Sequence, residues 1–499
     1  MILYIDGHDY HYEMENLCAI FLPYEKIKVV EALPEEIAPE EIVAVTRYRE
    51  AEGVGKLYAS LRIGGKTLEN SSTLPLSDAA QEPFDKICAV KLALLLYGLF
   101  VKLCNYEPKW GVLIGVRPIK LLRKLTADMG EEAALRYFLT ELKVSPEKTE
   151  LSRLTMQNEQ KILSLSRPES YSLYVSIPFC PTRCAYCSFV ASSMEKTKKL
   201  IPGYVDLLCE ELVYTAKVAK ELGLRLETIY FGGGTPTTLT AEQLSRLLDT
   251  IHSHFDLSTC RELTVEAGRP DTITAEKLLA MKERGVTRIS INPQTMNDDV
   301  LRRIGRHHTA AQTEEAFSLA RRCGMDNINM DVIAGLPGDT GDSFRSTMDQ
   351  LTSLDPESIT VHTLALKRSS DINQNGKKEF HNDAALAGEM LDYSQSTLTK
   401  HGYEPYYLYR QSRMVGNLEN TGWAKPGYAN LYNVYIMDET HTILACGAGA
   451  VSKIRDPYSE RLERVFNFKY PYEYRDRFHE MLERKEKVKE IYTKFGIVF

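Results

Sequence analysis

The middle of the chain alternates between short apolar runs and longer amphipathic stretches, and this alternation limits the folds open to it. The six apolar runs are SLYVSI (172–177), ETIYF (227–231), ELTVEA (262–267), TRISIN (287–292), NINMDVIAG (327–335) and SITVHTL (358–364). Alternation of this kind predicts βαβ units on a parallel sheet with right-handed crossovers. We therefore expect an α/β fold, a partial (β/α)6 barrel of the TIM type, with an open doubly wound sheet as the alternative. In either arrangement the functional groups lie at the carboxyl ends of the strands.

The segments on either side of this core have a different pattern. Residues 1–168 contain short β-type runs broken by glycine and then helical stretches, one of them starting at Pro118 after a strand-like run, and they predict a separate N-terminal α+β domain. The barrel is expected over 169–400. Residues 401–499 predict a short C-terminal extension that packs on the barrel, with a long ordered loop (405–433), strand-like runs (434–437 and 442–446) and a helix (471–491).

Charge and hydropathy exclude several classes of protein. Lys and Arg total 61 against 68 Asp and Glu, a net charge of −7, which argues against a chain that neutralises a nucleic-acid backbone. The most apolar stretch, Leu92–Val101, is too short to span a bilayer and suits a buried helix. The N-terminus lacks the basic and then apolar layout of a secretory signal. We expect a cytoplasmic protein without a membrane span and without a nucleic-acid partner.

Three of the ten cysteines, Cys180, Cys184 and Cys187, form a C-x3-C-x2-C arrangement directly after the first barrel strand. The other seven are scattered through apolar segments, where cysteine is usually a small core residue. Structural zinc requires four ligands, and no fourth Cys or His follows within twelve residues. Three thiolates can instead hold three corners of a [4Fe–4S] cluster and leave the fourth iron open. The spacing favours the iron–sulfur cluster.

Polar groups also follow the other predicted strands. The turn FGGGTPT (231–237) exposes backbone N–H groups that suit a carboxylate or ammonium-bearing ligand, although such turns are often only tight turns. Strand three ends at Glu266, strand four runs into Gln294, and strand five carries Asp331 among apolar residues. A carboxylate in an apolar strand requires a partner, so Asp331 indicates either a bound ligand or a structural salt bridge.

The loop that carries the three cysteines has Tyr186 before its last cysteine. In this it resembles the cluster loop of the radical S-adenosylmethionine (SAM) superfamily, where the open iron binds the methionine part of SAM. The blocks YVSIPFCPTRCAYCSF, YFGGGTPT, LTVEAGRPD, RISINPQTMNDDVLRRIGRHHT and NINMDVIAGLPGDT resemble those of the oxygen-independent coproporphyrinogen III oxidase (coproporphyrinogen dehydrogenase) family. The resemblance covers roughly residues 170–365, where a barrel of the radical SAM type is implied. WGVLIGVRP and GNLENTGWAKPG are similar to the HemZ-like bacterial subgroup.

The resemblance implies roles for matching positions. Cys180, Cys184 and Cys187 would hold the cluster that cleaves SAM. The positions expected to contact the SAM on the open iron are Tyr174, Tyr186, Gly233 and Glu266. Those expected to hold a second SAM are Gly234, Thr235, Gln294, Arg306, Asp331 and Ala365, and Val451 is expected to be another SAM contact.

The implied reaction is radical decarboxylation of two propionates of coproporphyrinogen III to vinyl groups, which gives protoporphyrinogen IX in heme biosynthesis. The implied partners are a tetrapyrrole and a reductant protein such as flavodoxin or ferredoxin. A heme-binding, heme-transfer or heme-modifying relative is the alternative. Three departures from the family pattern bear on the substrate: Ser176 replaces a usual His, Phe189 replaces a frequent fourth cysteine, and only 48 residues follow Val451. Candidates for propionate contacts are Arg117, Lys120, Lys367 and Arg368, with solvated surface bases as the alternative.

Overall fold

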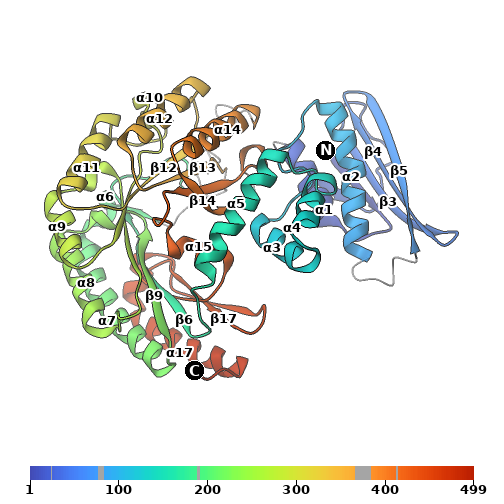
Figure 1. The fold of residues 1–499 in the computed structure, drawn as a ribbon. Coiled ribbons are helices and arrows are strands. Elements are labelled where there is room, and N and C mark those ends of the chain that lie inside the picture. Colours follow the sequence, from blue (N-terminus) through green and yellow to red (C-terminus); the bar gives the residue numbers. More distant parts are fainter. Residues whose placement is uncertain (24, 77–83, 188–190, 366–383, 412–413) are drawn as a thin grey trace. The chain divides into compact units, whose positions relative to one another are not determined.

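The computed structural model describes the chain except for residues 24, 77–83, 188–190, 366–383 and 412–413. The chain divides into two compact units (Figure 1). Unit 1 comprises residues 1–153 and 410–418, and unit 2 comprises 154–409 and 419–499, so the division falls within one helix, α5 (Pro146–Leu163). The expected domain boundaries at 168 and 400 stay a prediction.

Unit 1 contains a five-stranded sheet in the order β2-β1-β3-β4-β5. Its strands are β1 (Ile2–Asp6), β2 (Lys28–Val30), β3 (Val43–Ala51), β4 (Val54–Ile63) and β5 (Lys66–Pro75), and its helices are α1 (His11–Phe21), α2 (Phe84–Cys104), α3 (Pro118–Met129), α4 (Glu131–Thr140) and the start of α5. The strands β3, β4 and β5 form two antiparallel hairpins, with the glycine breaks of the sequence at their turns. The expected strand-like run at 110–117 is wrong, because these residues form turns and bends that lead into α3 at Pro118.

Helix α2 is long and apolar enough to cross a membrane, and among the described helices it alone meets that criterion. Its buried residues include Leu92, Leu96, Leu99 and Phe100, and the helix packs on β4 and β5. A helix whose apolar side chains are covered by a sheet is the core helix of a domain. This agrees with the buried helix expected at Leu92–Val101.

Unit 2 is built on an eleven-stranded sheet in the order β14-β15-β13-β12-β11-β10-β9-β6-β16-β17-β18. The six predicted strands are confirmed in sequence order and lie side by side in parallel: β6 (Ser170–Ile177), β9 (Arg225–Gly233), β10 (Glu262–Gly268), β11 (Arg288–Ile291), β12 (Ile328–Ala334) and β13 (Ser358–Thr363). Figure 1 shows the crossover helices on the outer side of the curved sheet, as in a partial barrel rather than a doubly wound sheet.

Threonine starts most of these crossover helices. The helices are α7 (Ile201–Glu221), α8 (Ala241–His254), α9 (Ala275–Glu283), α10 (Asp298–Arg303), α11 (Ala310–Arg322), α12 (Gly341–Leu354) and α14 (Ala384–Lys400). The side chains of Thr240, Thr274, Thr309 and Thr340 accept hydrogen bonds from backbone N–H groups of α8, α9, α11 and α12. These caps satisfy helix N–H groups that have no partner within the helix.

The C-terminal residues extend the same sheet rather than forming a loop. The expected long loop at 405–433 is wrong, since it contains β14 (Glu404–Tyr409) and β15 (Asn420–Ala424). The strand-like run at 434–437 lies in helix α15 (Leu431–Asp438), whereas the run at 442–446 is β16 (Thr442–Cys446), parallel to β6. β17 (Val451–Arg455) and β18 (Leu462–Phe466) follow in antiparallel order. The last predicted helix is two helices, α16 (Pro471–Asp476) and α17 (Phe478–Phe495).

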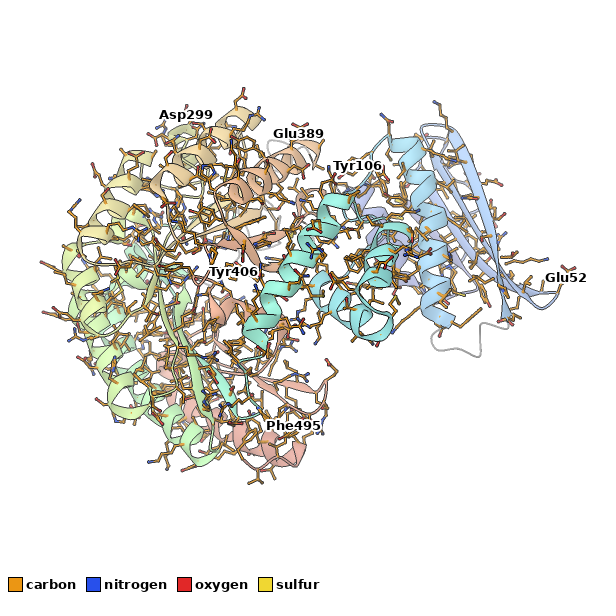
Figure 2. All side chains as sticks on the ribbon, viewed as in Figure 1. Glu52, Tyr106, Asp299, Glu389, Tyr406 and Phe495 are labelled. Atoms are coloured by element: carbon orange, nitrogen blue, oxygen red, sulfur yellow. The ribbon has the colours of Figure 1, made fainter. Side chains whose placement is uncertain are left out.

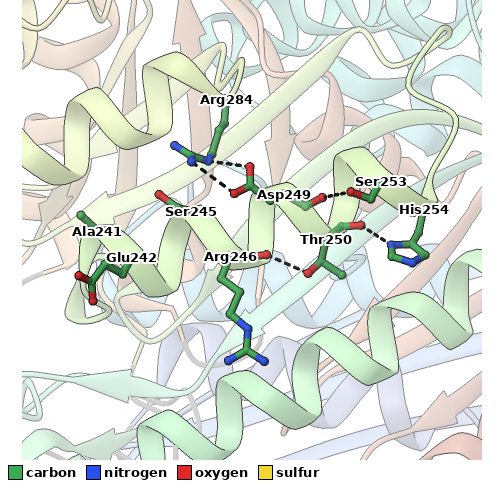
Figure 3. Close-up of a pocket in the computed structure, with 9 residues that line it drawn as sticks. All are labelled: Ala241, Glu242, Ser245, Arg246, Asp249, Thr250, Ser253, His254 and Arg284. Atoms are coloured by element: carbon green, nitrogen blue, oxygen red, sulfur yellow. Dashed lines mark hydrogen bonds and ion pairs between the residues drawn. The ribbon is translucent and has the colours of Figure 1, made fainter.

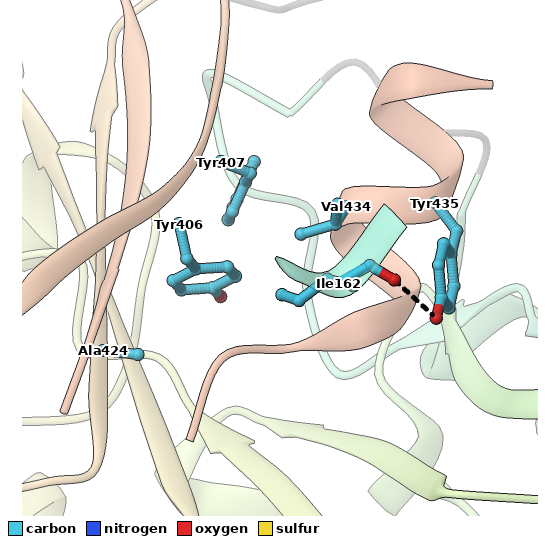
Figure 4. Packing of buried hydrophobic residues seen from close by; sticks show 6 residues of the cluster. All are labelled: Ile162, Tyr406, Tyr407, Ala424, Val434 and Tyr435. Atoms are coloured by element: carbon cyan, nitrogen blue, oxygen red, sulfur yellow. Dashed lines mark hydrogen bonds between the residues drawn. The ribbon is translucent and has the colours of Figure 1, made fainter. Parts of the chain in front are cut away.

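Helix α15 packs at the amino-terminal ends of the barrel strands. Glu262, the first residue of β10, accepts hydrogen bonds from Leu431 N at 2.8 Å, Tyr432 N at 3.3 Å and the Asn430 side chain at 3.1 Å. An apolar cluster consisting of Ile162, Tyr406, Tyr407, Ala424, Val434 and Tyr435 lies beside it (Figure 4). Figure 2 shows Tyr406 in the interior, whereas Asp299 and Glu389 lie at the outer surface. This end of the barrel is therefore filled by protein.

Candidate functional site

The three cysteines lie on one loop that follows β6. Cys180 belongs to a two-residue strand, β7 (Phe179–Cys180), which pairs with β8 (Ser192–Ser193), and Cys187 N donates to Cys184 O at 3.0 Å. Ala185 N donates to Ile304 O at 3.0 Å, which fastens the loop to the end of α10. All three cysteines are half-buried. The loop therefore holds three thiols in a partly covered place at the carboxyl ends of the strands.

The chemistry of these thiols fits a cluster better than a single metal ion. Burial raises the pKa of the Cys180 thiol to about 11, with Cys187 and Cys184 close enough to add to the shift, so the free thiol stays protonated until a metal binds. Within the described residues, no three His, Cys, Asp or Glu side chains converge closely enough to hold one metal ion. A four-iron cluster bound through three different irons needs more widely spaced sulfurs, which three thiols on one loop can supply.

The glycine-rich turn packs directly on the cysteine loop. Gly234 N donates to Ile177 O at 2.8 Å, and a Cβ at Gly234 would lie 2.5 Å from the backbone oxygen of Phe179. Gly233 has a φ of +105°, which favours glycine. The hydroxyl of Thr235, which is 3% exposed, lies 3.6 Å from Cys180 Sγ. Packing thus accounts for the missing side chain at 234, and Thr235 touches a predicted cluster ligand.

Glu266 lies next to stacked tyrosine rings inside the barrel. The rings of Tyr174, Tyr230 and Tyr432 stack on one another in a group of three, with centroid distances of 4.4 to 6.3 Å, and the Tyr230 hydroxyl donates to Glu266 Oε1 at 2.5 Å. Burial raises the pKa of Glu266 to about 7, against the effect of that hydrogen bond. Glu266 can therefore change its protonation state near neutral pH. Tyr432 comes from α15, far along the chain, and sequence analysis missed it.

Asp331 faces His362, a residue that sequence analysis also missed. Asp331 Oδ1 accepts from Asn329 Nδ2 at 2.7 Å, and Asp331 Oδ2 lies 3.8 Å from His362 Nε2. Although burial opposes ionisation, His362 and Asn329 hold the pKa of Asp331 below its ordinary value. The side chains of Asp331 and His362 are still 19% and 28% exposed. Asp331 is therefore an ionised, partly open carboxylate, compatible with both roles expected for it.

Gln294, Arg306 and His308 are buried and carry polar atoms that find no partner among the described residues. These atoms are Gln294 Oε1, Arg306 Nε and both ring nitrogens of His308. Gln294 has a φ of +69°, rare for a residue with a side chain, and its backbone is bound to β12 through Asp331 O and Ile333 N. We call these three residues the unpartnered cluster.

The unpartnered cluster lies beside the cysteine loop. Arg306 Nη1 donates to Asn292 O at 2.6 Å, and its guanidinium interacts with Tyr186 and Cys184. His308 lies near Arg306, and burial lowers its pKa to about 4, so the ring is neutral at physiological pH. The signal that could have revealed His308 is a polar residue directly before the Thr309 cap, in the same block as Arg306.

The remaining predicted positions are less central. Ala365 is the second residue after β13, and Val451 is the first residue of β17. Arg117 and Lys120 lie at the start of α3 in unit 1. Lys367, Arg368 and Phe189 fall outside the described residues. The structure thus brings the cysteines, Tyr174, Tyr186, Thr235, Glu266, Gln294, Arg306 and Asp331 to the barrel strands and their carboxyl ends.

An open hollow of about 650 Å³ lies elsewhere, on the outer face of α8 (Figure 3). Several of its polar groups have partners: Asp249 accepts from Arg284 Nε at 2.8 Å, and Ser253 and His254 hydrogen-bond to backbone carbonyls of the same helix. Since it lies away from the strand ends and contains satisfied surface groups, it is not the functional site.

Comparisons with known proteins agree with this geometry. Residues 174–351 match the model of the radical SAM superfamily. HemZ of Bacillus subtilis, an oxygen-independent coproporphyrinogen-III oxidase-like protein, is 41% identical over 383 residues, which are 76% of this chain and 76% of HemZ. The heme chaperone HemW of Bacillus subtilis is 34% identical over 263 residues, which are 52% of this chain and 68% of HemW.

A solved structure has the same fold. Coproporphyrinogen III oxidase (HemN) from Escherichia coli, a radical SAM enzyme, matches 65% of this chain and 73% of its own with a TM-score of 0.52 and 24% identity. The cofactors of the superfamily are a [4Fe–4S] cluster and SAM, as the cysteine loop predicts. The resemblance seen in the sequence is confirmed: the chain belongs to the radical SAM superfamily and, within it, to the family of oxygen-independent coproporphyrinogen III oxidase-like proteins that includes HemZ.

Proposed function

We propose that this protein uses a radical derived from SAM to convert coproporphyrinogen III to protoporphyrinogen IX. The observation that carries the proposal is the unpartnered cluster beside the cysteine loop: four buried polar atoms of Gln294, Arg306 and His308 have no partner in the part of the chain that is described. Buried polar groups are almost always hydrogen-bonded, so such a group at the carboxyl ends of barrel strands indicates a ligand site.

The chemistry of these side chains suits an amino-acid group such as the methionine part of SAM. The Arg306 guanidinium can pair with a carboxylate, and the Gln294 carbonyl oxygen can accept from an ammonium. Glu266 and Asp331 can accept from ribose hydroxyls or from an ammonium. Cys180, Cys184 and Cys187 would hold three irons of the cluster. We propose Tyr174, Tyr186, Gly233, Gly234, Thr235, Ala365 and Val451 as further contacts to one or two SAM molecules.

Cys180, Cys184 and Cys187 would hold a cluster that, when reduced, would supply the electron for cleavage of SAM and so the radical chemistry needed to remove a hydrogen atom from a propionate side chain. The chain's own residues then have three tasks: to orient SAM, to place the propionate beside it and to keep water out. Helix α15 and the ring of Tyr432 support the last task, because they fill the barrel from its amino-terminal end. In the proposed reaction each propionate would lose carbon dioxide, one hydrogen atom, which ends in 5′-deoxyadenosine, and one electron, which passes to an external one-electron acceptor, and would become a vinyl group.

Two further parts of the proposal concern the surroundings of the enzyme. We propose that a reductant protein such as flavodoxin or ferredoxin supplies the electron and that the protein works in the cytoplasm. The net charge of −7 supports a soluble metabolic enzyme rather than a protein that binds nucleic acid.

Anaerobic turnover tests the proposal. The reconstituted protein is incubated with coproporphyrinogen III, dithionite and SAM, and tetrapyrroles and 5′-deoxyadenosine are separated by chromatography. We expect divinyl product and 5′-deoxyadenosine in stoichiometric relation, and neither from the variant Cys184→Ala, which loses the cluster. Cleavage of SAM without any vinyl product would contradict the proposed substrate while leaving radical chemistry in place.

A heme-binding or heme-transfer role is the second candidate, and the similarity to the heme chaperone HemW favours it. In that case the protein binds heme tightly and yields no vinyl product in the same assay. Methylated, ring-opened products from heme would instead identify a heme-modifying enzyme.

A further inference from the structure

A buried arginine lies where β10 meets the cysteine loop. Arg269 follows directly after β10, at the start of the short helix η4 (Pro270–Thr272), and it is 3% exposed. Arginine is almost never fully buried unless its charge is paired, because removing a guanidinium from water is unfavourable. Arg269 therefore needs a reason to be there, and the expected SAM contacts do not include it.

Its contacts lead to the cysteine loop. Arg269 Nε and Nη2 donate to the two oxygens of Asp271 at 2.9 and 2.8 Å, a two-pronged pair, and Nη1 donates to Thr182 Oγ1 at 2.6 Å. Thr182 stands between Cys180 and Cys184 in the sequence. Its hydroxyl donates onward to Gly305 O at 3.3 Å. Arg269 thus joins the end of β10, through the cysteine loop, to the end of α10.

The pair also places charge near the thiols. The Arg269 cation lies close enough to Cys180 to act on it electrostatically, because it is bound to Thr182 two residues further along the loop. The Asp271 carboxylate stays ionised, since its hydrogen bonds to Arg269 hold its pKa low against the effect of burial. His308 lies beside the pair and is neutral, and Arg306 is the other buried cation nearby. The two charges of the pair nearly cancel, so removal of either one changes the local potential in a known direction.

We propose that Arg269 is a positioning residue for the iron–sulfur cluster: it holds the loop in shape through Thr182, and together with Asp271 it sets the electrostatic potential at the cluster. Partners of this kind, one step removed from the metal ligands, orient the ligands and tune reduction potentials. The inference rests on the cluster that the family carries and is independent of the proposed tetrapyrrole substrate.

Two variants with opposite charge changes test the electrostatic part. Reduction makes the cluster more negative, so a net negative charge nearby lowers its midpoint potential. Arg269→Gln removes the positive partner of the Asp271 carboxylate and should therefore shift the midpoint potential downward. Asp271→Asn removes the negative partner of the Arg269 cation and should shift the midpoint potential upward. Arg269→Lys keeps the positive charge, so its midpoint potential should stay near that of the wild type. The midpoint is measured on the reconstituted full chain by redox titration followed by electron paramagnetic resonance. Shifts of the same sign in both variants, or no shift in either, would overturn this part.

Thr182→Val tests the positioning part, because it cuts the contact and keeps both charges. We expect iron to be lost to a chelator about 10-fold faster than from the wild type, with little change in the midpoint potential. Arg288→Gln is the matched control: Arg288 is 2% exposed but stands at the other end of the sheet, at the start of β11, and donates to Tyr428 O at 3.0 Å.

The control should keep the wild-type rate of iron loss even where it unfolds at a lower temperature. Equal rates for Thr182→Val and the wild type, or equally fast loss from Arg288→Gln, would overturn the positioning role. If Arg269→Gln does not fold, Asp271→Asn and Thr182→Val still decide the two parts separately.

Discussion

The replacement Lys485→Met should destabilise unit 2, because it leaves the buried carboxylate of Glu211 without its positively charged partner. Glu211 of α7 is fully buried and accepts four hydrogen bonds: from Gly447 N at 2.7 Å, the Tyr474 hydroxyl at 2.6 Å, Asn467 Nδ2 at 2.7 Å and Lys485 Nζ at 2.8 Å. Lys485 of α17 is 2% exposed and supplies the only formal positive charge among these donors. These interactions connect the C-terminal helix α17 to the turn that precedes β17.

The magnitude follows from what remains after the change. Removal of one partner of a buried ion pair leaves an uncompensated charge and costs about 3–5 kcal/mol. Since three uncharged donors still bind Glu211, we expect the lower end, ~3 kcal/mol. For a unit of about 340 residues that corresponds to a fall in melting temperature of roughly 4 °C. The double variant Glu211→Gln with Lys485→Met removes both charges and should recover at least half of the loss.

Scanning calorimetry of the full-length apoprotein measures these changes. Lys489→Met is the matched control, because Lys489 also lies on α17 but is 28% exposed and pairs at the surface, where an ion pair contributes less than about 1 kcal/mol. The reasoning fails if Lys485→Met melts within 1 °C of its control, or if the double variant is no more stable than Lys485→Met alone.

Two further predictions concern a glycine and a histidine. Gly234→Ala should displace the backbone before Cys180 and reduce the iron bound on anaerobic reconstitution, because its Cβ would lie 2.5 Å from a backbone oxygen. Gly203→Ala is the control and should bind iron normally, because the space around Gly203 is open. Equal iron contents in the two variants would contradict this prediction. His441 is buried between Ser166 and Ser172, and burial lowers its pKa to about 3. As pH falls from 7.5 to 5, the imidazole gains a proton in the unfolded chain but not in the folded one, so His441 lowers the free energy of unfolding by about 2 kcal/mol. Urea unfolding measured across this pH range should show this loss in the wild type, and His441→Gln should lack it.

Local patterns were sufficient to predict the strands and the cysteine loop. The six barrel strands are apolar and rich in β-branched residues, and breaks separate them from long helices, so each strand could be recognised by itself. The cysteine loop needs only eight consecutive residues. Glu266 and Asp331 could be found because a carboxylate in an apolar strand is unusual wherever the strand is placed.

The errors arose where distant residues decide the structure. Residues 434–437 have strand-like composition, yet they form part of α15, because the Asn430 side chain caps the helix and Glu262 accepts from its first N–H groups. Arg269 gave no local sign of its role, since its partner Thr182 is 87 residues away. The secondary-structure propensity of a short segment is only a weak guide to its structure, because tertiary contacts can override it.

The two ends of the barrel differ in one respect that identifies the functional end. Buried polar groups occur at both. At the amino-terminal end the buried charged groups are satisfied within the protein, as Glu262 is by three donors from the start of α15 and Arg288 is by a backbone carbonyl, and single unsatisfied atoms occur at Asn327 and Tyr406. At the carboxyl end Gln294, Arg306 and His308 keep polar atoms that no described residue satisfies. Since folding alone would select against such atoms, a group of four of them beside the cysteine loop is best explained by a ligand bound there.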